Sequence, residues 1–371
     1  MKKFVNWYSK LSKKKKRDFL IFCFLMCWFI FNMFLNLSSH IKETQQQETI
    51  NNLAPVSLLD ESQITPEPTS TTQLHPNSNG SGNGSPRPEN TNSPEVSFSE
   101  NNNIMELFFL DTGNSDSSLL KLPDGKNILF DCGDTDDGQS IVEFLHSNNV
   151  YELSAVVLSH MHSDHGGGCK VVADNFNVDT WYIPNIPDKY VPTTVWFQNL
   201  IETLVSKNVN AISPNSGEAI ASSDSYNVFF LNSVNGKDYG DDQNAYSLVV
   251  MIEYGNHKYV IGGDALKQNE SEILQNWGSV YNLDVDVMKG NHHCSKTSNS
   301  ESWIRSLKPE HIVCTVGKNN DYNHPHQSVI NLFKKYDINV YRSDKNGTIK
   351  IIDDGENYTI EPGLESANGG K

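Results

Sequence analysis

The sequence predicts a layered α/β domain over residues 103–361, preceded by a membrane-spanning segment and a low-complexity linker. From residue 104 onward, strand-like segments alternate with segments of helical periodicity, which is typical of sheets covered by helices. Residues 38–102 hold too few apolar side chains to bury a core, so we expect a flexible linker there. Residues 362–371 are expected to form a flexible tail.

The first 37 residues have the composition of a membrane anchor. Residues 1–18 form a basic segment, and residues 19–37 are almost all apolar and carry no charge. A helix needs about 20 such residues to span a bilayer, whereas the apolar region of a cleaved signal peptide, the alternative, usually has about 7–15. The positive-inside rule then predicts a single-pass protein of the cell membrane, with a cytoplasmic N-terminus and the domain of residues 103–361 outside the cell.

The charge of the chain limits its partners. The formal net charge is −16, although Lys and Arg dominate the first 17 residues, so the remainder is still more acidic. An acidic body binds polyanions poorly without specific contacts, which disfavours a processive nuclease. We expect the membrane as a partner through the N-terminal helix, and the sequence indicates no protein partner.

The domain is divided into alternating elements. Strands are predicted at residues 104–110, 118–122, 127–130, 155–158, 180–183, 226–231, 246–254, 258–261, 285–288, 312–316, 339–342 and 348–352. Helices are predicted at residues 139–146, 169–176, 192–207, 270–276, 300–306 and 327–336. The four cysteines of the domain, Cys132, Cys169, Cys294 and Cys314, form no C-x-x-C pair, and their scattered spacing predicts buried free thiols.

One loop concentrates residue types that bind metals. It reads S-H-M-H-S-D-H-G-G-G and follows a predicted strand, with His160, His162, Asp164 and His165 within six positions. Imidazole and carboxylate groups hold Zn²⁺, Mn²⁺ or Fe²⁺, and two pairs of ligands suit two ions about 3.5–4 Å apart. The alternative is a polar loop with incidental histidines.

This loop resembles the H-x-H-x-D-H signature of the metallo-β-lactamase superfamily. The resemblance implies an αββα sandwich with a metal site at the sheet edges. It implies that Asp264, in a G-D context, bridges two metals; its alternative role is a helix N-cap. It also implies that Asp131, in L-F-D-C-G-D, orients ligating histidines, unless it is a simple turn residue.

The run K-G-N-H-H-C-S resembles the family pattern K-x-x-H-H-G-S, with Cys294 in the place of the glycine. By this resemblance His293 ligates metal and His292 contacts the second shell or a substrate phosphate, with the reverse assignment left open. Many relatives supply a further His between the main loop and the bridging Asp, but His257 lies in a predicted hairpin turn and is expected at the surface. The first site would then rely on His160, His162, Asp264 and water, with help from Asn244.

Without that further histidine, the chain resembles the soluble metallohydrolase domain of ComEC-type competence proteins. Residues 111–116 read D-T-G-N-S-D, and residues 319–326 read N-N-D-Y-N-H-P-H, close to motifs of that group. The resemblance implies that Asp116, His324 and His326 line the site. A turn histidine before proline is the alternative for His324.

These residues predict a hydrolase that binds two divalent ions, Zn²⁺ or Mn²⁺, and attacks with a metal-bound hydroxide. The expected reaction is phosphodiester hydrolysis of a nucleotide, a nucleic acid end or an envelope component. Asp164 would steer the water while His324 or His292 contacts the phosphate. The alternatives are a β-lactam or lactone hydrolase and a non-catalytic metal-binding envelope protein.

Overall fold

The computed structural model describes residues 103–364, which form two β-sheets. The first has eight strands, in the order β15 (Tyr358–Leu364), β14 (Thr348–Asp353), β1 (Met105–Phe109), β2 (Ser118–Lys121), β3 (Asn127–Phe130), β4 (Glu152–Val157), β5 (Asn177–Tyr182) and β6 (Asn210–Ile212). The second has seven, in the order β13 (Asn339–Arg342), β12 (His311–Cys314), β11 (Val287–Lys289), β10 (His257–Ile261), β9 (Val250–Tyr254), β8 (Tyr226–Phe230) and β7 (Ala219–Ser222).

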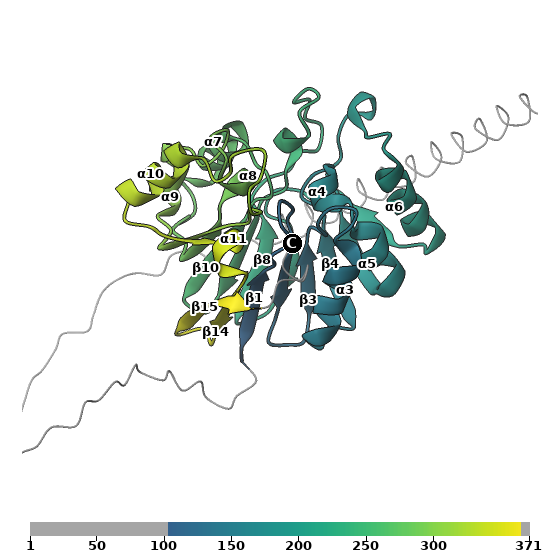
Figure 1. The fold of residues 1–371 in the computed structure, drawn as a ribbon, viewed down its shortest axis with the longest axis horizontal. Coiled ribbons are helices and arrows are strands. Elements are labelled where there is room, and N and C mark those ends of the chain that lie inside the picture. The colour runs from purple at the N-terminus through teal and green to yellow at the C-terminus, as the bar shows by residue number, and fades with distance from the viewer. Residues whose placement is uncertain (1–102, 365–371) are drawn as a thin grey trace, which may run out of the picture. The chain divides into compact units, whose positions relative to one another are not determined.

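Helices cover the outer faces of the sheets (Figure 1). They are α3 (Gly138–Ser147), α5 (Cys169–Asn175) and α6 (Val195–Ser206) beside the first sheet, and α7 (Lys267–Trp277), α9 (Glu301–Leu307) and α10 (Gln327–Lys335) beside the second. Short turns complete the chain: α4 (Ser163–Gly166), α8 (Asn291–Cys294), α11 (Ser343–Asn346), η1 (Asp188–Tyr190) and η2 (Gln243–Tyr246). The predicted αββα arrangement is therefore confirmed.

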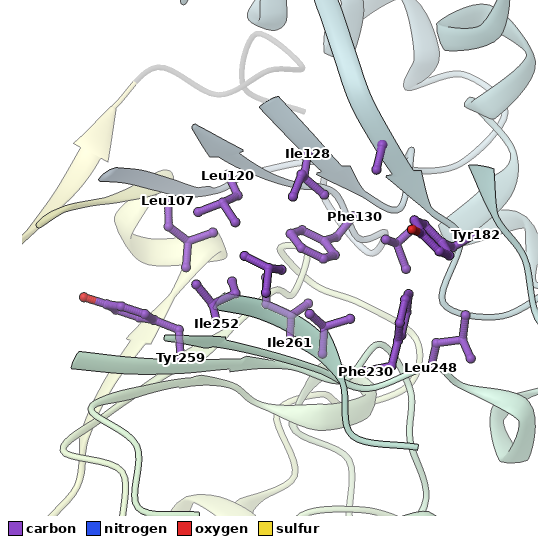
Figure 2. Packing of buried hydrophobic residues seen from close by; sticks show 14 of the residues in the cluster. Leu107, Leu120, Ile128, Phe130, Tyr182, Phe230, Leu248, Ile252, Tyr259 and Ile261 are labelled. Carbon is purple, nitrogen blue, oxygen red and sulfur yellow. The ribbon is translucent and has the colours of Figure 1, made fainter. Parts of the chain in front are cut away.

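The layers form because side chains along each strand point alternately to the two faces of its sheet. Leu107 of β1 packs between the sheets against residues such as Tyr259 and Ile252, as Figure 2 shows. Its neighbour Phe108 points the other way and packs with Ile141 and other residues under the helices. Because successive strand residues face opposite sides, each sheet buries both of its faces.

The predicted elements agree with the structure in most places, with a few differences. The strand expected at 246–254 begins only at Val250, because Tyr246 ends η2 and residues 247–249 connect the two elements. Strands β6, β7 and β15 were not predicted, since the first two are short and largely exposed and the last contains Pro and Gly. Strand β15 also continues to Leu364, past residue 361 where we placed the end of the domain.

The expectation of free thiols is wrong. Cys132 pairs with Cys169, and Cys294 pairs with Cys314, with Cα atoms 5.0 and 5.6 Å apart. The second pair forms because β11 and β12 are parallel neighbours, so the segments that follow them meet. Spacing along the sequence, at separations of 37 and 20 residues, does not reveal this pairing.

The predicted basic segment, membrane anchor and linker lie outside the described residues. Within residues 103–364, no helix has both the length and the apolar character needed to cross a membrane.

An ion-pair network on the first sheet gives a test of the fold. Glu106 of β1 contacts Lys121 Nζ at 2.9 Å and Lys350 Nζ at 2.5 Å. Burial by itself raises the pKa of Glu106, but the two lysines outweigh it and lower the pKa below 4.5. Because the pKa of Glu106 is lower in the folded than in the unfolded protein, its ionised form stabilises the fold at pH values above the unfolded-state pKa. Glu106→Gln should therefore cost about 1 kcal/mol of unfolding free energy at pH 7.

That cost should shrink below pH 4.5 and vanish once the pH falls below the lowered pKa of the folded protein. Urea unfolding of Glu106→Gln between pH 3 and 7 would measure it, with the exposed Glu152→Gln as the control. A cost for Glu106→Gln that is constant across this range would contradict the prediction.

Candidate metal centre

The site lies where five strands end. Strands β3 and β4 are parallel in the first sheet, and β10, β11 and β12 are parallel in the second. Because the carboxyl ends of parallel strands share one edge, the segments that follow them meet there. These segments carry Asp131, His165, Asp264, His293 and Thr315.

Asp131 holds the histidine-rich loop in place. Its carboxylate accepts hydrogen bonds from the backbone N–H and the hydroxyl of Ser159, both at 2.7 Å, and contacts His165 Nδ1 at 2.7 Å. The loop can approach this closely because Gly168 has no side chain; a Cβ there would lie 2.2 Å from the Cys132 carbonyl oxygen. Asp131 therefore directs His165 Nε2 away from itself and toward the centre of the site.

His293 is oriented in the same manner from the other sheet. Its Nδ1 lies 2.8 Å from the carbonyl oxygen of Thr315, which can only accept a hydrogen bond. The N–H is therefore on Nδ1, and Nε2 remains as the atom with a free lone pair when the ring is neutral.

Three buried polar atoms converge on one point. His165 Nε2, His293 Nε2 and Asp264 Oδ1 have no hydrogen-bond partner among residues 103–364. Asp264 Oδ1 lies 3.2 Å from His165 Nε2 and 3.6 Å from His293 Nε2. Unpaired buried polar atoms are costly, so a cluster of three with ligand chemistry fits a bound cation. The carboxylate of Asp164 also faces this point, 3.7 Å from His293 Nε2.

His160 and His162 form a second pair of facing ligands. His160 Nε2 lies 3.0 Å from His162 Nδ1, and the His160 ring centroid is 4.2 Å from that of His165. Two ligands of a tetrahedral zinc ion, each about 2.0–2.1 Å from it, lie about 3.3 Å apart. The spacing of these two nitrogens therefore suits one ion beside the first.

Asp116 belongs to the cluster, but its carboxylate also contacts Lys289 and Thr315. One atom from each of Asp116, His165, Asp264 and His293 lies within 4.8 Å of the others. However, Asp116 forms an ion pair with the buried Lys289 and accepts a hydrogen bond from the Thr315 hydroxyl. Asp116 Oδ2 makes no hydrogen bond within residues 103–364, but it faces the ammonium group of Lys289, so Asp116 is less available as a metal ligand than Asp264.

The charges in the cluster are those of a cation site. Burial lowers the pKa of His165, but the carboxylates of Asp264 and Asp131 raise it well above the usual value. Burial also lowers the pKa of His293, and Asp116 and Asp264 raise it to about 9. Protons on these two histidines therefore balance the negative charge of the carboxylates, and a bound metal ion would displace those protons.

A cavity of about 550 Å³ opens over these ligands. Its wall consists of Asn114, Asp134, His162, Ser163, Asp164, Asn244, Asp264, His292, His293, Tyr322 and His324. Burial and the charges of His293 and His292 lower the pKa of His324 to about 4. His324 is therefore neutral at pH 7, so it can offer an N–H to a substrate oxygen but is a poor proton source.

The structure brings most of the predicted site residues together. Asp164, His165, Asp264 and His293 meet at the convergence point, His160 and His162 form a pair beside His165, and Asn244, His292 and His324 line the cavity. His326 does not line it; its Nδ1 accepts a hydrogen bond from the backbone N–H of Lys296. His292 Nε2 lies 3.5 Å from Asp264 Oδ2, so it also reaches the site's edge.

The expectation of a surface position for His257 is wrong. Its side chain is 12% exposed and pairs with the buried Asp353, at 3.0 Å from Nδ1 to Oδ1. The residue begins β10, whereas Asp264 follows the end of that strand, so His257 does not contribute to the metal centre.

Several residues of the site have no role that the sequence predicts, among them Lys289, Thr315 and Tyr322. Lys289 stands in the K-G-N-H-H run but was not recognised as the partner of Asp116. Thr315 is a backbone acceptor, which no motif shows. Tyr322, 68% exposed at the cavity wall, is the tyrosine of N-N-D-Y-N-H-P-H, and its exposure could not be predicted.

Comparisons with known proteins agree with this geometry. The sequence profile of the metallo-beta-lactamase superfamily matches residues 110–315. ComE operon protein 3 of Bacillus subtilis (strain 168) is 28% identical over 262 residues, which is 66% of this chain and 32% of that protein. Competence protein ComA of Neisseria gonorrhoeae is 27% identical over 235 residues, which is 63% of this chain and 30% of that protein.

This chain thus spans about a third of the length of these curated relatives. Among solved structures, Igni18, a metallo hydrolase from Ignicoccus hospitalis, is 17% identical with a TM-score of 0.39, covering 67% of this chain and 98% of that one. The profile and the curated relatives confirm both resemblances drawn from the motifs.

Proposed function

The chain belongs to the metallo-β-lactamase superfamily, and we propose that it is a membrane-anchored, extracytoplasmic hydrolase of phosphodiesters that uses two divalent metal ions. One observation carries the proposal: His165 Nε2, His293 Nε2 and Asp264 Oδ1 are buried, unpartnered within the described chain and directed at one point. Such a donor set of imidazole and carboxylate suits Zn²⁺ or Mn²⁺.

Divalent ions held there would supply water of lowered pKa and stabilise negative charge on a phosphoryl oxygen. The two oxygens of Asp264 face His165 Nε2 at 3.2 Å and His292 Nε2 at 3.5 Å, so Asp264 would help to hold these ions, with Asp164 beside it at the cavity wall. His292 and His324, both with lowered pKa values from burial, offer neutral N–H groups to the substrate. The reaction needs no side-chain nucleophile.

The cavity favours a small diester or a chain end over an extended polyanion. Neither Lys nor Arg is among the residues of the described chain that line it. Binding along a nucleic acid backbone relies on such cations. The substrate is therefore a nucleotide, a nucleic acid end or a cell-envelope phosphodiester.

The disulfides support a location outside the cytoplasm. Two bridges, Cys132–Cys169 and Cys294–Cys314, are expected in an oxidising compartment and are rare in the cytosol. Together with the basic and apolar segments predicted for residues 1–37, they favour an outward-facing domain on a single N-terminal anchor.

A substrate panel tests the proposed reaction. The purified full-length chain, stripped of metal and reloaded with Zn²⁺ or Mn²⁺, should hydrolyse bis-p-nitrophenyl phosphate and lose this activity in a chelator. A chromogenic β-lactam and a lactone, assayed in parallel, should be turned over much more slowly. Preferential hydrolysis of either would replace the phosphodiesterase assignment, and stoichiometric metal without any turnover would favour a metal-binding role.

Tyr322 should contribute to the binding of aromatic substrates. Its ring is 68% exposed at the cavity wall and stacks on His324, with centroids 5.7 Å apart. Stacking on an aromatic side chain is worth about 1–3 kcal/mol, so Tyr322→Ala should raise KM for bis-p-nitrophenyl phosphate about 5- to 150-fold and change kcat little. Tyr322→Phe is the matched control and should keep the wild-type KM.

A further inference from the structure

Three consecutive residues at the metal centre adopt a left-handed backbone. His292, His293 and Cys294 have φ angles of 51°, 51° and 60°. Residues other than glycine rarely adopt this region, because Cβ crowds the backbone, and a run of three is strained. The family pattern that this segment resembles has glycine where this chain has Cys294. The left-handed turn at residues 292–294 must therefore be stabilised by something other than a glycine at position 294.

The disulfide to Cys314 supplies a covalent constraint at this point. Both cysteines are fully buried, and their Cα atoms lie 5.6 Å apart. The bridge packs tightly below the turn, since a Cβ on Gly290 would lie 2.2 Å from Cys294 Sγ. Residue 294 is thus fixed relative to the end of β12.

The bridge joins a candidate ligand to the group that orients it. Cys294 directly follows His293, and Cys314 directly precedes Thr315. The Thr315 carbonyl is the acceptor 2.8 Å from His293 Nδ1, and its hydroxyl donates to Asp116. Loosening either cysteine would let the histidine and its acceptor move apart.

We propose that the Cys294–Cys314 disulfide is a positioning device for the metal centre: it keeps residues 292–294 left-handed and aims His293 Nε2 at the metal. The inference rests on the metal site of the proposed function. It makes metal affinity dependent on the redox state of this bridge. A phosphine reductant would break the S–S bond and be oxidised to the phosphine oxide. One water molecule would supply the oxygen of that oxide and one hydrogen to each sulfur.

A pair of variants of the full-length chain separates this role from simple cross-linking. Cys294→Ala/Cys314→Ala removes the bridge and leaves a residue that resists the left-handed region, whereas Cys294→Gly/Cys314→Ala removes it but allows that region. Zinc affinity is measured by competition with a chromophoric chelator, and thermal unfolding is measured without metal.

The alanine variant should bind zinc about 10- to 100-fold more weakly than wild type, the effect typical of losing support for a ligand. The glycine variant should bind about 5- to 30-fold more tightly than the alanine variant, although its Tm is no higher. A bridge that only stabilises the fold would leave both variants with the zinc affinity of wild type, and that result would overturn the proposal.

Reduction of the wild-type chain with tris(2-carboxyethyl)phosphine gives a second measurement if the alanine variant does not fold. Zinc affinity should fall as the Cys294–Cys314 bridge opens, which mass spectrometry of alkylated peptides follows; unchanged affinity after its opening would contradict the inference. Wild type that binds no zinc would refute the metal centre itself. Zinc binding without bis-p-nitrophenyl phosphate hydrolysis would refute only the proposed reaction.

Discussion

Asp264→Asn is expected to abolish hydrolysis, with turnover falling about 10³-fold or more. The carboxylate faces His165 Nε2 at 3.2 Å and His293 Nε2 at 3.6 Å through one oxygen, and His292 Nε2 at 3.5 Å through the other. Asparagine keeps the shape but loses the charge that holds divalent ions, and a loss of several kcal/mol corresponds to this factor. Metal content by mass spectrometry and turnover of bis-p-nitrophenyl phosphate measure the two effects.

The exposed Asp284, paired with Lys308 on the surface, provides the matched control. Asp284→Asn should keep wild-type metal content and turnover. Circular dichroism should show that Asp264→Asn remains folded, because the substitution changes neither volume nor backbone. Full metal content and turnover in Asp264→Asn would remove Asp264 from the centre.

The sequence could predict the parts of the site that are written locally. The spacing of His160, His162, Asp164 and His165 indicates a metal loop because all four residues leave one strand together. Asp264 and His293 came from resemblance, and their place beside this loop depends on parallel strands in a second sheet, whose pairing no short motif encodes.

The features that escaped prediction all depend on contacts between distant segments. Lys289 meets Asp116 only because β11 ends beside the loop between β1 and β2. Cys294 meets Cys314 because β11 and β12 are neighbours. His257 is largely buried because β14, far along the chain, supplies Asp353. Local pattern carries no information about such partners.

Lys289→Met should destabilise the metal-free protein by about 3–5 kcal/mol. Lys289 is 1% exposed, forms an ion pair with Asp116, which is 2% exposed, and donates to the Gly263 carbonyl at 3.0 Å. Removing the cation leaves Asp116 as a buried charge without its main partner, which is far more costly than replacing both members of a pair. Urea unfolding at pH 7 measures the loss.

The double variant Lys289→Met/Asp116→Asn identifies the cause. Asparagine removes the uncompensated charge and can still accept from the Thr315 hydroxyl, so the double variant should be more stable than Lys289→Met alone. Burial raises the pKa of Asp116, and Lys289, His293 and His165 together outweigh it in the wild type, so without Lys289 the carboxyl should take up a proton more readily. The destabilisation by Lys289→Met should therefore shrink as the pH falls. If it stays constant with pH and persists in the double variant, lost packing of the lysine stem and not the stranded carboxylate is its source.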